Sequence, residues 1–160
     1  MPVGSPVHRL ESVTSTNDAA RGLALAGAAH GTAVVAGEQT RGRGTKGREW
    51  HSPSGLGLYA SFILRGPANG PVPWPHLLPL AAGLAAADAV LAAAGVAVRL
   101  KWPNDLVHGE KKLGGILSEG VSGGADGGFA IVGVGLNVGH GPDDFPDALK
   151  GSSTSLRLAG

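Results

Sequence analysis

The chain has 160 residues, which suits one domain, and 42% of them are hydrophobic against 16% charged. This composition excludes a disordered chain, and a formal net charge of +1 argues against a protein whose main task is to bind nucleic acid through broad electrostatics. The absence of cysteine excludes disulfides, thiolate catalysis and thiolate metal sites. We expect a soluble, cytoplasmic protein with no membrane segment, because the N-terminus lacks a basic leader and the apolar run at 77–94 contains Pro79, Gly83 and Asp88.

The first forty residues predict two strands separated by a helix. The segment His8–Val13 alternates between apolar and polar residues, as a strand does. Ser15 with Asp18 three residues later fits a capping box, and residues 19–29 are rich in strong helix formers. The apolar run Ala33–Glu38 then predicts a buried strand.

A further strand and a second helix are predicted in the middle of the chain. Residues 56–65 have the period of two expected for a sheet, with the even-numbered residues from Leu56 to Leu64 on one face and Tyr59, Ser61 and Arg65 on the other. After a Pro/Gly-rich connection, a helix is predicted from the apolar residues that recur at helical spacing. These are Leu80, Leu84, Ala87 and Leu91, and Gly95 stands where a left-handed helix terminus is expected.

The rest of the chain predicts mainly strands. Residues 96–102 alternate in polarity, 106–108 and 111–113 resemble a hairpin around Gly109-Glu110, and strands at 113–121 and 129–138 flank a Gly/Ser loop. Ser155 begins what looks like the opening turn of a helix. Because the strands come in hairpins with two helices between them, we predict an α+β or mixed α/β fold, with a mixed, largely antiparallel β-sheet and helices packed on one side.

A basic, glycine-rich loop lies at 41–48. Its Gly42-x-Gly44-x-x-Gly47 matches the dinucleotide-binding pattern, but that pattern requires a helix directly afterwards, whereas Pro53, Gly55 and a strand follow here. We therefore reject a Rossmann site. A glycine loop with Arg43, Lys46 and Arg48 can instead fold over a ligand and present N–H groups to carboxylate and phosphate oxygens; the alternative is a solvated basic loop or a nonspecific nucleic-acid patch.

Other segments have both a structural and a functional interpretation. Ser15-Thr16-Asn17 fits either a helix cap or a set of fixed hydrogen-bonding groups for a neutral polar head in an apolar pocket. Lys101-Trp102-Pro103-Asn104-Asp105 fits a proline turn, and Lys111-Lys112 fits a pair of solvated hairpin charges. The strand containing Gly133 and Gly135 fits tight packing against a neighbouring layer.

Taken together and in this order, the segments resemble those of the biotin protein ligases. The resemblance rests on four motifs, which are Gln39-Thr40-x-Gly42-Arg43-Gly44 with Trp50, Lys101–Asp105, Lys111-Lys112-Leu113-Gly114-Gly115, and Gly133-x-Gly135-x-Asn137. It implies the fold shared by biotin ligases and class II aminoacyl-tRNA synthetases. The implied activity is that of a biotin–[biotin carboxyl-carrier protein] ligase, which uses ATP and Mg²⁺ to convert biotin into biotinyl-5′-AMP and transfers it to a lysine of the carrier protein of a biotin-dependent carboxylase.

The resemblance also implies roles for individual residues. Lys112 and Arg43 would be catalytic. The residues implied to bind biotin are Ser15, Thr16, Asn17, Gln39, Gly42, Arg43, Gly44, Thr45, Lys112 and Gly115. Those implied to bind ATP are Arg48, Trp50, Lys101, Asn104, Asp105 and Asn137, with Asp105 also a candidate ligand for Mg²⁺. Thr45 departs from the family pattern, which commonly has a further arginine there that helps to retain the reactive adenylate.

The chemistry supplies a physical reason for Lys112. Joining a carboxylate to the α-phosphorus of ATP brings two anions together, and two unit charges about 4 Å apart repel by roughly 4 kcal/mol at an effective dielectric constant near 20. A fixed ammonium offsets that repulsion. Its benefit grows as negative charge develops on the phosphorus in the transition state.

By the same resemblance, residues 1–160 would form a catalytic domain that is incomplete at its C-terminus and lacks the family's small C-terminal β-barrel. No helix-turn-helix segment precedes residue 7, so we expect no DNA binding. Two alternatives stay open, namely a catalytically weak biotin-binding fragment and a lipoate or octanoate ligase-type relative. RNA binding through 41–48 is disfavoured, because one Tyr and three Phe offer few stacking surfaces.

Overall fold

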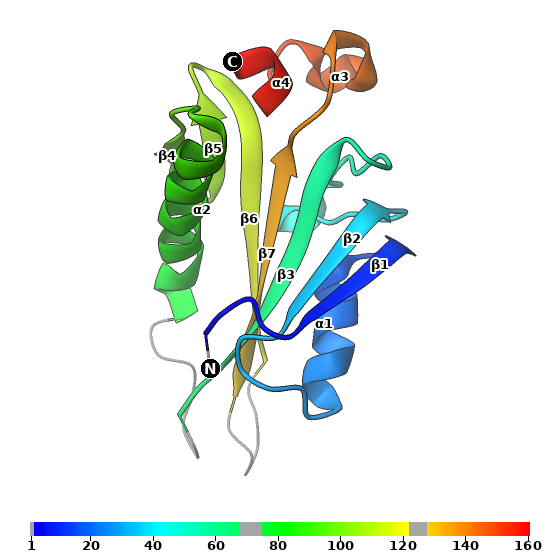
Figure 1. Cartoon of the computed structure of the whole chain (residues 1–160), viewed down its shortest axis with the longest axis vertical. Coiled ribbons are helices and arrows are strands. Elements are labelled where there is room, and N and C mark those ends of the chain that lie inside the picture. The colour runs from blue at the N-terminus through cyan, green and yellow to red at the C-terminus, as the bar shows by residue number, and fades with distance from the viewer. Residues whose placement is uncertain (1, 68–74, 122–127) are drawn as a thin grey trace.

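The computed structural model describes residues 2–67, 75–121 and 128–160, so most of the Pro/Gly-rich connection and of the Gly/Ser loop lies outside the described residues. Seven strands form one sheet in the order β1-β2-β3-β7-β6-β5-β4 (Figure 1). They are β1 (Val7–Val13), β2 (Ala33–Gln39), β3 (Gly57–Arg65), β4 (Arg99–Lys101), β5 (Asp105–His108), β6 (Lys111–Val121) and β7 (Phe129–Asn137). Only β1 and β2 pair in parallel, which confirms the mixed, largely antiparallel sheet.

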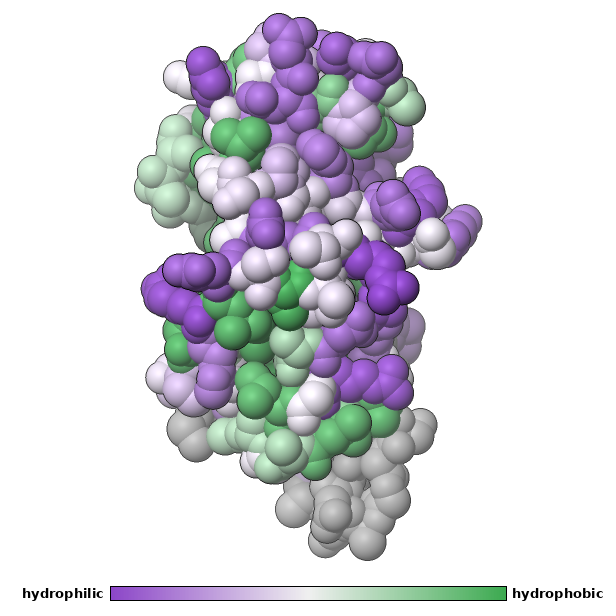
Figure 2. All heavy atoms as spheres, turned by 90° about the vertical axis from the view of Figure 1, so that its right-hand side faces the viewer, coloured by the Kyte–Doolittle hydropathy of each residue, from purple (hydrophilic) through white to green (hydrophobic). Residues whose placement is uncertain are grey.

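Two longer helices pack on this sheet, α1 (Thr16–Leu25) and α2 (Leu78–Ala94). Shorter turns complete the described chain, namely α3 (Asp147–Lys150), α4 (Leu156–Ala159), η1 (Thr45–Gly47), η2 (Pro75–Leu77) and η3 (Pro142–Asp144). α3 and α4 lie together at the upper end of the molecule in Figure 1. Hydrophilic side chains gather over this end in the surface view of Figure 2, whereas hydrophobic ones gather toward the lower end.

The two long helices cover opposite faces of the sheet, which corrects the prediction that the helices pack on one side. Strand β7 shows this directly, because neighbouring residues of a strand point to opposite faces. Its Phe129 and Ile131 pack in a cluster with the α1 residues Ala20 and Ala24. The even-numbered residues from Val132 to Leu136 point to the other face and pack with Val90 of α2. Both faces of β7 are thus buried, and a strand buried on both faces carries no polarity pattern that would place the helices.

Helix α1 begins where the predicted cap places it but ends earlier than its composition predicts. It starts at Thr16, directly after Ser15 at the N-cap position, but Ser15 makes no side-chain cap hydrogen bond. The predicted capping box is therefore wrong. Instead, the Gln39 side chain, at the end of strand β2, accepts a hydrogen bond from the backbone N–H of Thr16 at 2.8 Å. This bond satisfies one of the backbone donors that the first turn of a helix leaves free.

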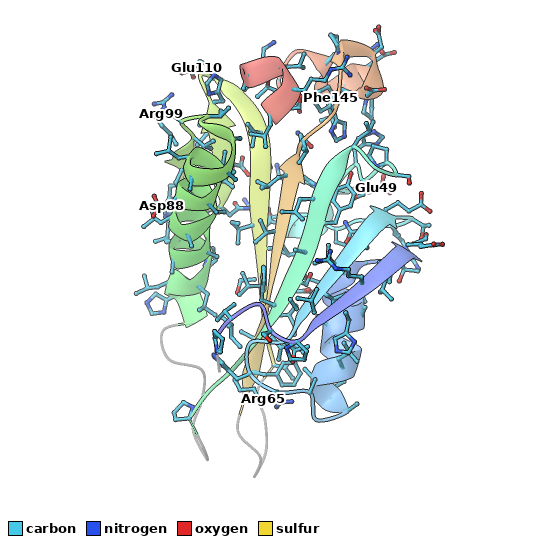
Figure 3. All side chains as sticks on the ribbon, viewed as in Figure 1. Glu49, Arg65, Asp88, Arg99, Glu110 and Phe145 are labelled. Carbon is cyan, nitrogen blue, oxygen red and sulfur yellow. The ribbon has the colours of Figure 1, made fainter. Side chains whose placement is uncertain are left out.

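Helix α2 ends as predicted, at Gly95 in the left-handed conformation with φ 69°, but its buried face differs from the predicted stripe. Leu84 and Leu91 are 59% and 52% exposed, whereas Gly83 and Val90 are buried. Asp88 points outward from the helix in Figure 3. Because α2 is rich in Ala and Leu on every side, periodicity alone could not identify its inner face.

Strand β3 is buried most deeply on the face opposite to the longer row of apolar residues. Tyr59, Ser61 and Ile63 are 1%, 0% and 0% exposed, whereas on the other face Ala60 is 4% exposed but Leu58 is 39% exposed. The buried face includes a serine because it lies under the start of α1, beside the site described below. Among the described helices, none combines the length and apolar character needed to cross a membrane.

The assignment of the inner face of α2 is testable with two neighbouring residues. Val90→Ala should lower the free energy of unfolding by about 1–2 kcal/mol, because it removes two methyl groups from a packed cluster. Leu91→Ala removes a larger side chain yet should change stability by no more than about 0.5 kcal/mol, because Leu91 is mostly exposed. Urea denaturation of both variants measures the difference, and a larger loss in Leu91→Ala would contradict the assignment.

Candidate functional site

A cavity of about 340 Å³ lies between the start of α1, the glycine loop, the β5–β6 hairpin and the segment 145–153. This volume is within the range of small-molecule sites. Glu49, Glu110 and Phe145 line it from three separate parts of the chain (Figure 3). Every predicted site residue except Gly42 also lines it, namely Ser15, Thr16, Asn17, Gln39, Arg43, Gly44, Thr45, Arg48, Trp50, Lys101, Asn104, Asp105, Lys112, Gly115 and Asn137.

One wall of the cavity is a buried network of neutral polar groups at the start of α1. Thr16 donates from Oγ1 to Gln39 Oε1 at 3.0 Å, in addition to the backbone hydrogen bond already described. Ser61 Oγ lies 2.8 Å from Thr16 Oγ1 and 2.6 Å from Asn17 Oδ1. Since a buried polar group without a partner costs about 1–3 kcal/mol, these mutual hydrogen bonds hold Thr16 and Asn17 in one arrangement. The wall is therefore preorganised.

Gln39 also joins the two ends of the glycine loop. Its Nε2 donates to Ser52 Oγ at 2.9 Å, and Ser52 Oγ donates to Trp50 O at 3.0 Å. Gly42 packs within this junction, where an added Cβ would overlap Trp50 O and lie 2.5 Å from Ser52 Oγ. Gly42, assigned to biotin by the resemblance, thus closes the base of the loop and does not line the cavity.

Arg43 of the loop is held by two carboxylates from different elements. Its Nη1 and Nη2 donate to the two oxygens of Glu119 at 3.0 and 2.9 Å, and Nη2 also donates to Asp18 Oδ1 at 2.7 Å. Glu119 Oε2 accepts a further hydrogen bond from Asn17 Nδ2 at 2.6 Å. The loop, the start of α1 and strand β6 therefore meet at Glu119.

Lys112 projects into the cavity from the start of β6. Its Nζ lies 2.6 Å from Asp105 Oδ1 and 5.3 Å from the centre of the Trp50 ring. The backbone of Lys112 is fixed as well, because its N–H donates to Ser152 O and its carbonyl accepts from Thr154 N–H, each at 2.8 Å. The Lys112 side chain is 29% exposed. Its backbone is thus held by residues 152–154, and its ammonium lies beside a carboxylate and an aromatic face.

Glycines on two neighbouring strands make room for Trp50. A Cβ on Gly135 would lie 2.7 Å from the indole Nε1, and a Cβ on Gly115 would lie 3.4 Å from both the indole and Lys112 Cε. The indole therefore rests on bare backbone. Its Nε1–H is buried and has no hydrogen-bond acceptor within the described parts of the chain.

The two asparagines assigned to ATP make backbone hydrogen bonds. Asn104 Nδ2 donates to Ile116 O and Asn137 Nδ2 donates to Thr154 O, both at 2.9 Å. Asn104 thereby ties the turn after β4 to strand β6, and Asn137 ties the end of β7 to the segment that holds Lys112. Both residues line the cavity, and the side-chain amide of each also has an oxygen that can accept a hydrogen bond.

Burial controls the ionisation of two further groups near the cavity. It raises the pKa of Tyr59 to about 12, so the phenol stays protonated and donates to Pro53 O at 3.0 Å. Burial, and then the nearby His51, lower the pKa of His140, which stacks on the Phe145 ring at 4.8 Å. A neutral His140 fits this apolar packing.

Asp105 was also the candidate ligand for a divalent cation. Within residues 2–67, 75–121 and 128–160 no group of three or more His, Cys, Asp or Glu side chains could hold a metal ion. The Asp105 carboxylate is already paired with Lys112. The donor set therefore fits a Mg²⁺ ion only if phosphate oxygens and water supply most of its ligands, which is the usual way in which proteins bind Mg²⁺ with ATP.

Comparison with known proteins decides the family. The biotin/lipoate A/B protein ligase family matches residues 9–137, most of the chain. The chain belongs to this family. Within it, the bifunctional ligase/repressor BirA of Bacillus subtilis is 42% identical over 147 residues, which are 92% of this chain and 45% of that protein. The biotin–[acetyl-CoA-carboxylase] ligase of Paracoccus denitrificans is 40% identical over 137 residues, or 84% of this chain and 55% of that protein.

Solved structures of biotin protein ligases share the fold. The Aquifex aeolicus enzyme in complex with biotin and ATP matches with a TM-score of 0.75 and 36% identity, over 95% of this chain and 60% of that one. The Leishmania major enzyme in complex with biotinyl-5-AMP also gives 0.75, with 33% identity over 95% of this chain and 63% of that one. The chain spans about half the length of the curated relatives it matches.

Sequence reasoning missed the residues that connect the ligase motifs to one another. Ser61, Ser52 and Glu119 lie outside the motifs, and Asp18 was interpreted only as a capping residue. Ser61 carried a usable signal, because a polar residue within an otherwise apolar strand often needs a buried partner. Glu119 carried none, since its partners are 76 and 102 positions away along the chain.

The support of Trp50 by bare backbone is testable with two glycine substitutions in neighbouring strands. Gly135→Ala should destabilise the protein by about 1–3 kcal/mol and displace the indole, because the new methyl group would collide with it. Gly120→Ala, where no atom lies within 4 Å of the added Cβ, is the matched control and should be close to neutral. Thermal unfolding of both variants checks this, and equal stability would refute the packing argument.

Proposed function

We propose that this chain catalyses ATP-dependent biotin–protein ligation. A carboxylate oxygen of biotin attacks the α-phosphorus of ATP, and the bond to the leaving pyrophosphate breaks to give biotinyl-5′-AMP. The ε-amine of a carrier-protein lysine then attacks the acyl carbon, AMP leaves, and an amide forms with release of a proton. The names of the relatives and the ligands of the related structures support this reaction, which we place in the cytoplasm with a biotin carboxyl carrier protein as acceptor.

The observation that carries the proposal is the position of Lys112. Its ammonium shares one cavity with the neutral wall at Thr16 and Asn17 and with the arginine-bearing loop. A ligand whose neutral head lies on that wall can therefore present an anionic tail to the ammonium. A compact cation placed between two reacting anions is the arrangement that adenylation of a carboxylate requires.

The remaining lining residues divide between the two substrates. We assign Ser15, Thr16, Asn17 and Gln39 to the ureido head of biotin, because their buried hydroxyl and amide groups suit a neutral partner with two N–H groups and a carbonyl. We assign Gly44, Thr45 and Gly115 to contacts along the rest of biotin, and Arg43 with Lys112 to its carboxylate and the α-phosphate.

For ATP we assign Arg48 and Lys101 to the phosphates and Trp50, Asn104 and Asn137 to the nucleoside. The flat indole ring, which lines the cavity, supports the part given to Trp50. Mg²⁺ would arrive with ATP and take Asp105 as its one protein carboxylate. Binding of phosphate oxygens beside Lys112 would loosen the Lys112–Asp105 ion pair, since the ammonium then has a second anionic partner.

The role of Lys112 is tested against its neighbour. Lys112→Ala should lower the rate of pyrophosphate release from biotin and MgATP by about 100-fold or more, with a much smaller loss of biotin affinity, because the ammonium acts mainly on the charge that develops in the transition state. Lys111→Ala removes the same charge from an exposed position one residue away and should retain activity. Pyrophosphate release and calorimetric titration of biotin measure the two effects.

Three results would count against the proposal. The wild-type chain could fail to release pyrophosphate in the presence of biotin and MgATP, lipoate could displace biotin at equal concentration, or Lys112→Ala could turn over as fast as Lys111→Ala. The first two concern the reaction and the substrate, and the third concerns the assigned residue.

Thr45 gives a second prediction. In this chain Thr45 Oγ1 accepts a hydrogen bond from Arg48 Nη2 at 2.9 Å and brings no positive charge of its own to the cavity. Thr45→Arg should therefore slow the release of biotinyl-5′-AMP by roughly tenfold, the effect of one added charge-assisted hydrogen bond to phosphate. Biotinylation of a bystander protein that is not a carrier reports this release, and unchanged labelling would contradict the prediction.

A further inference from the structure

We infer that Glu119 is a positioning residue that latches the glycine loop over the cavity by holding Arg43. The inference concerns loop closure in the protein itself, and its consequence for ligand retention rests on the proposed function. Glu119 lies on β6, the strand that also carries Lys112. One strand thus supplies both the ammonium in the cavity and the anchor of the loop that borders it.

The hydrogen bonds between Glu119 and Arg43 have a specific, bidentate geometry. Arg43 meets the Glu119 carboxylate with both of its terminal nitrogens, the paired geometry in which guanidinium and carboxylate bind most strongly. Asp18 adds a second acceptor from the first turn of α1. The guanidinium also offsets the repulsion between these two carboxylates, so opening the loop would leave two like charges facing each other.

The latch leaves Arg43 able to bind a ligand. A guanidinium has five N–H donors, and the described contacts with Glu119 and Asp18 use three of them. The remaining donors include Nε–H. The Arg43 side chain is 39% exposed and lines the cavity. An anionic ligand can therefore bind Arg43 without breaking its hydrogen bonds to Glu119 and Asp18.

Asn17 connects the latch to the neutral wall. Its Nδ2 donates to Glu119 Oε2 at 2.6 Å, and its Oδ1 lies 2.6 Å from Ser61 Oγ. A ligand head that contacts Asn17 therefore acts on the same carboxylate that holds the loop. This shared residue predicts positive coupling, in which occupancy of the wall favours the closed loop.

Limited proteolysis tests the latch without any ligand. Glu119→Gln keeps an oxygen that can accept from Asn17 but removes the charge that holds Arg43. Trypsin cleavage after Lys46 and Arg48, followed by mass spectrometry, should become about fivefold faster than in the wild-type protein, since the pair is only partly buried. Glu11→Gln, the same change on the exposed strand β1, should cleave at the wild-type rate.

A double-mutant cycle separates a latch from a general loss of stability. Arg43→Gln should accelerate cleavage at the same two sites, and adding Glu119→Gln to it should have no further effect, because Arg43→Gln already removes the ion pair that Glu119→Gln would break. Additive effects would overturn the inference, as would an unchanged cleavage rate in Glu119→Gln or an equal rise at sites outside the loop. If the proposed function also holds, bound biotin should dissociate about fivefold faster from Glu119→Gln than from the wild-type protein.

The outcomes for the latch and for the proposed function are distinguishable. Cleavage of the free protein does not depend on ligation, so a wild-type chain that fails to release pyrophosphate would count against the function and leave the latch intact. Conversely, an active wild-type enzyme whose loop is cut equally fast in Glu119→Gln would contradict the latch alone.

Discussion

The site depends on two positions of β7 that carry no side chain. A Cβ on Gly133 would overlap the amide of Asn17, and a Cβ on Gly135 would lie 2.7 Å from the indole of Trp50. These glycines allow the start of α1 and the end of the glycine loop to approach the sheet backbone from two directions. The strand itself is a central member of the sheet, paired with β3 and β6, so the floor of the cavity is rigid. On this floor the neutral wall and Lys112 are held at a fixed separation.

Above this floor, individual polar side chains form hydrogen bonds that connect different elements. Gln39 accepts the first free N–H of α1 and donates to Ser52 at the far end of the glycine loop. Asn17 joins the wall to Glu119, and Asn137 joins the floor to the segment behind Lys112. A side-chain amide can both donate and accept, so a single amide can link two elements. The result is a preorganised site whose polar groups face the ligand already in position, which lowers the cost of binding.

The sequence predicts the strands and the mixed sheet, and all but one of the site residues that it names line the cavity, because the motifs combine local turn chemistry with residues that only a ligand would require. It does not predict which face of α2 is buried, since Ala and Leu surround the helix and Asp88 is its one charged residue. It places the N-cap of α1 correctly at Ser15 but not the hydrogen bond there, because the acceptor is Gln39, a residue of the next strand. It places both long helices on one face of the sheet, which is wrong, because β7 is apolar on both faces. It also misses Glu119, whose importance comes only from contacts that the fold creates between distant segments. Local sequence patterns thus specify the strands and the motifs, whereas contacts between distant segments determine how these elements pack together.

The central claim is that one preorganised cavity holds a neutral head at Thr16 and Asn17 and an acid group at Lys112. A crystal structure of the protein with biotin tests it most directly. The account predicts the ureido ring against the Thr16 and Asn17 side chains and the carboxylate within hydrogen-bonding distance of Lys112 Nζ, with the sheet floor unmoved. Biotin bound outside this cavity, or bound in it with its carboxylate directed away from Lys112, would contradict the account.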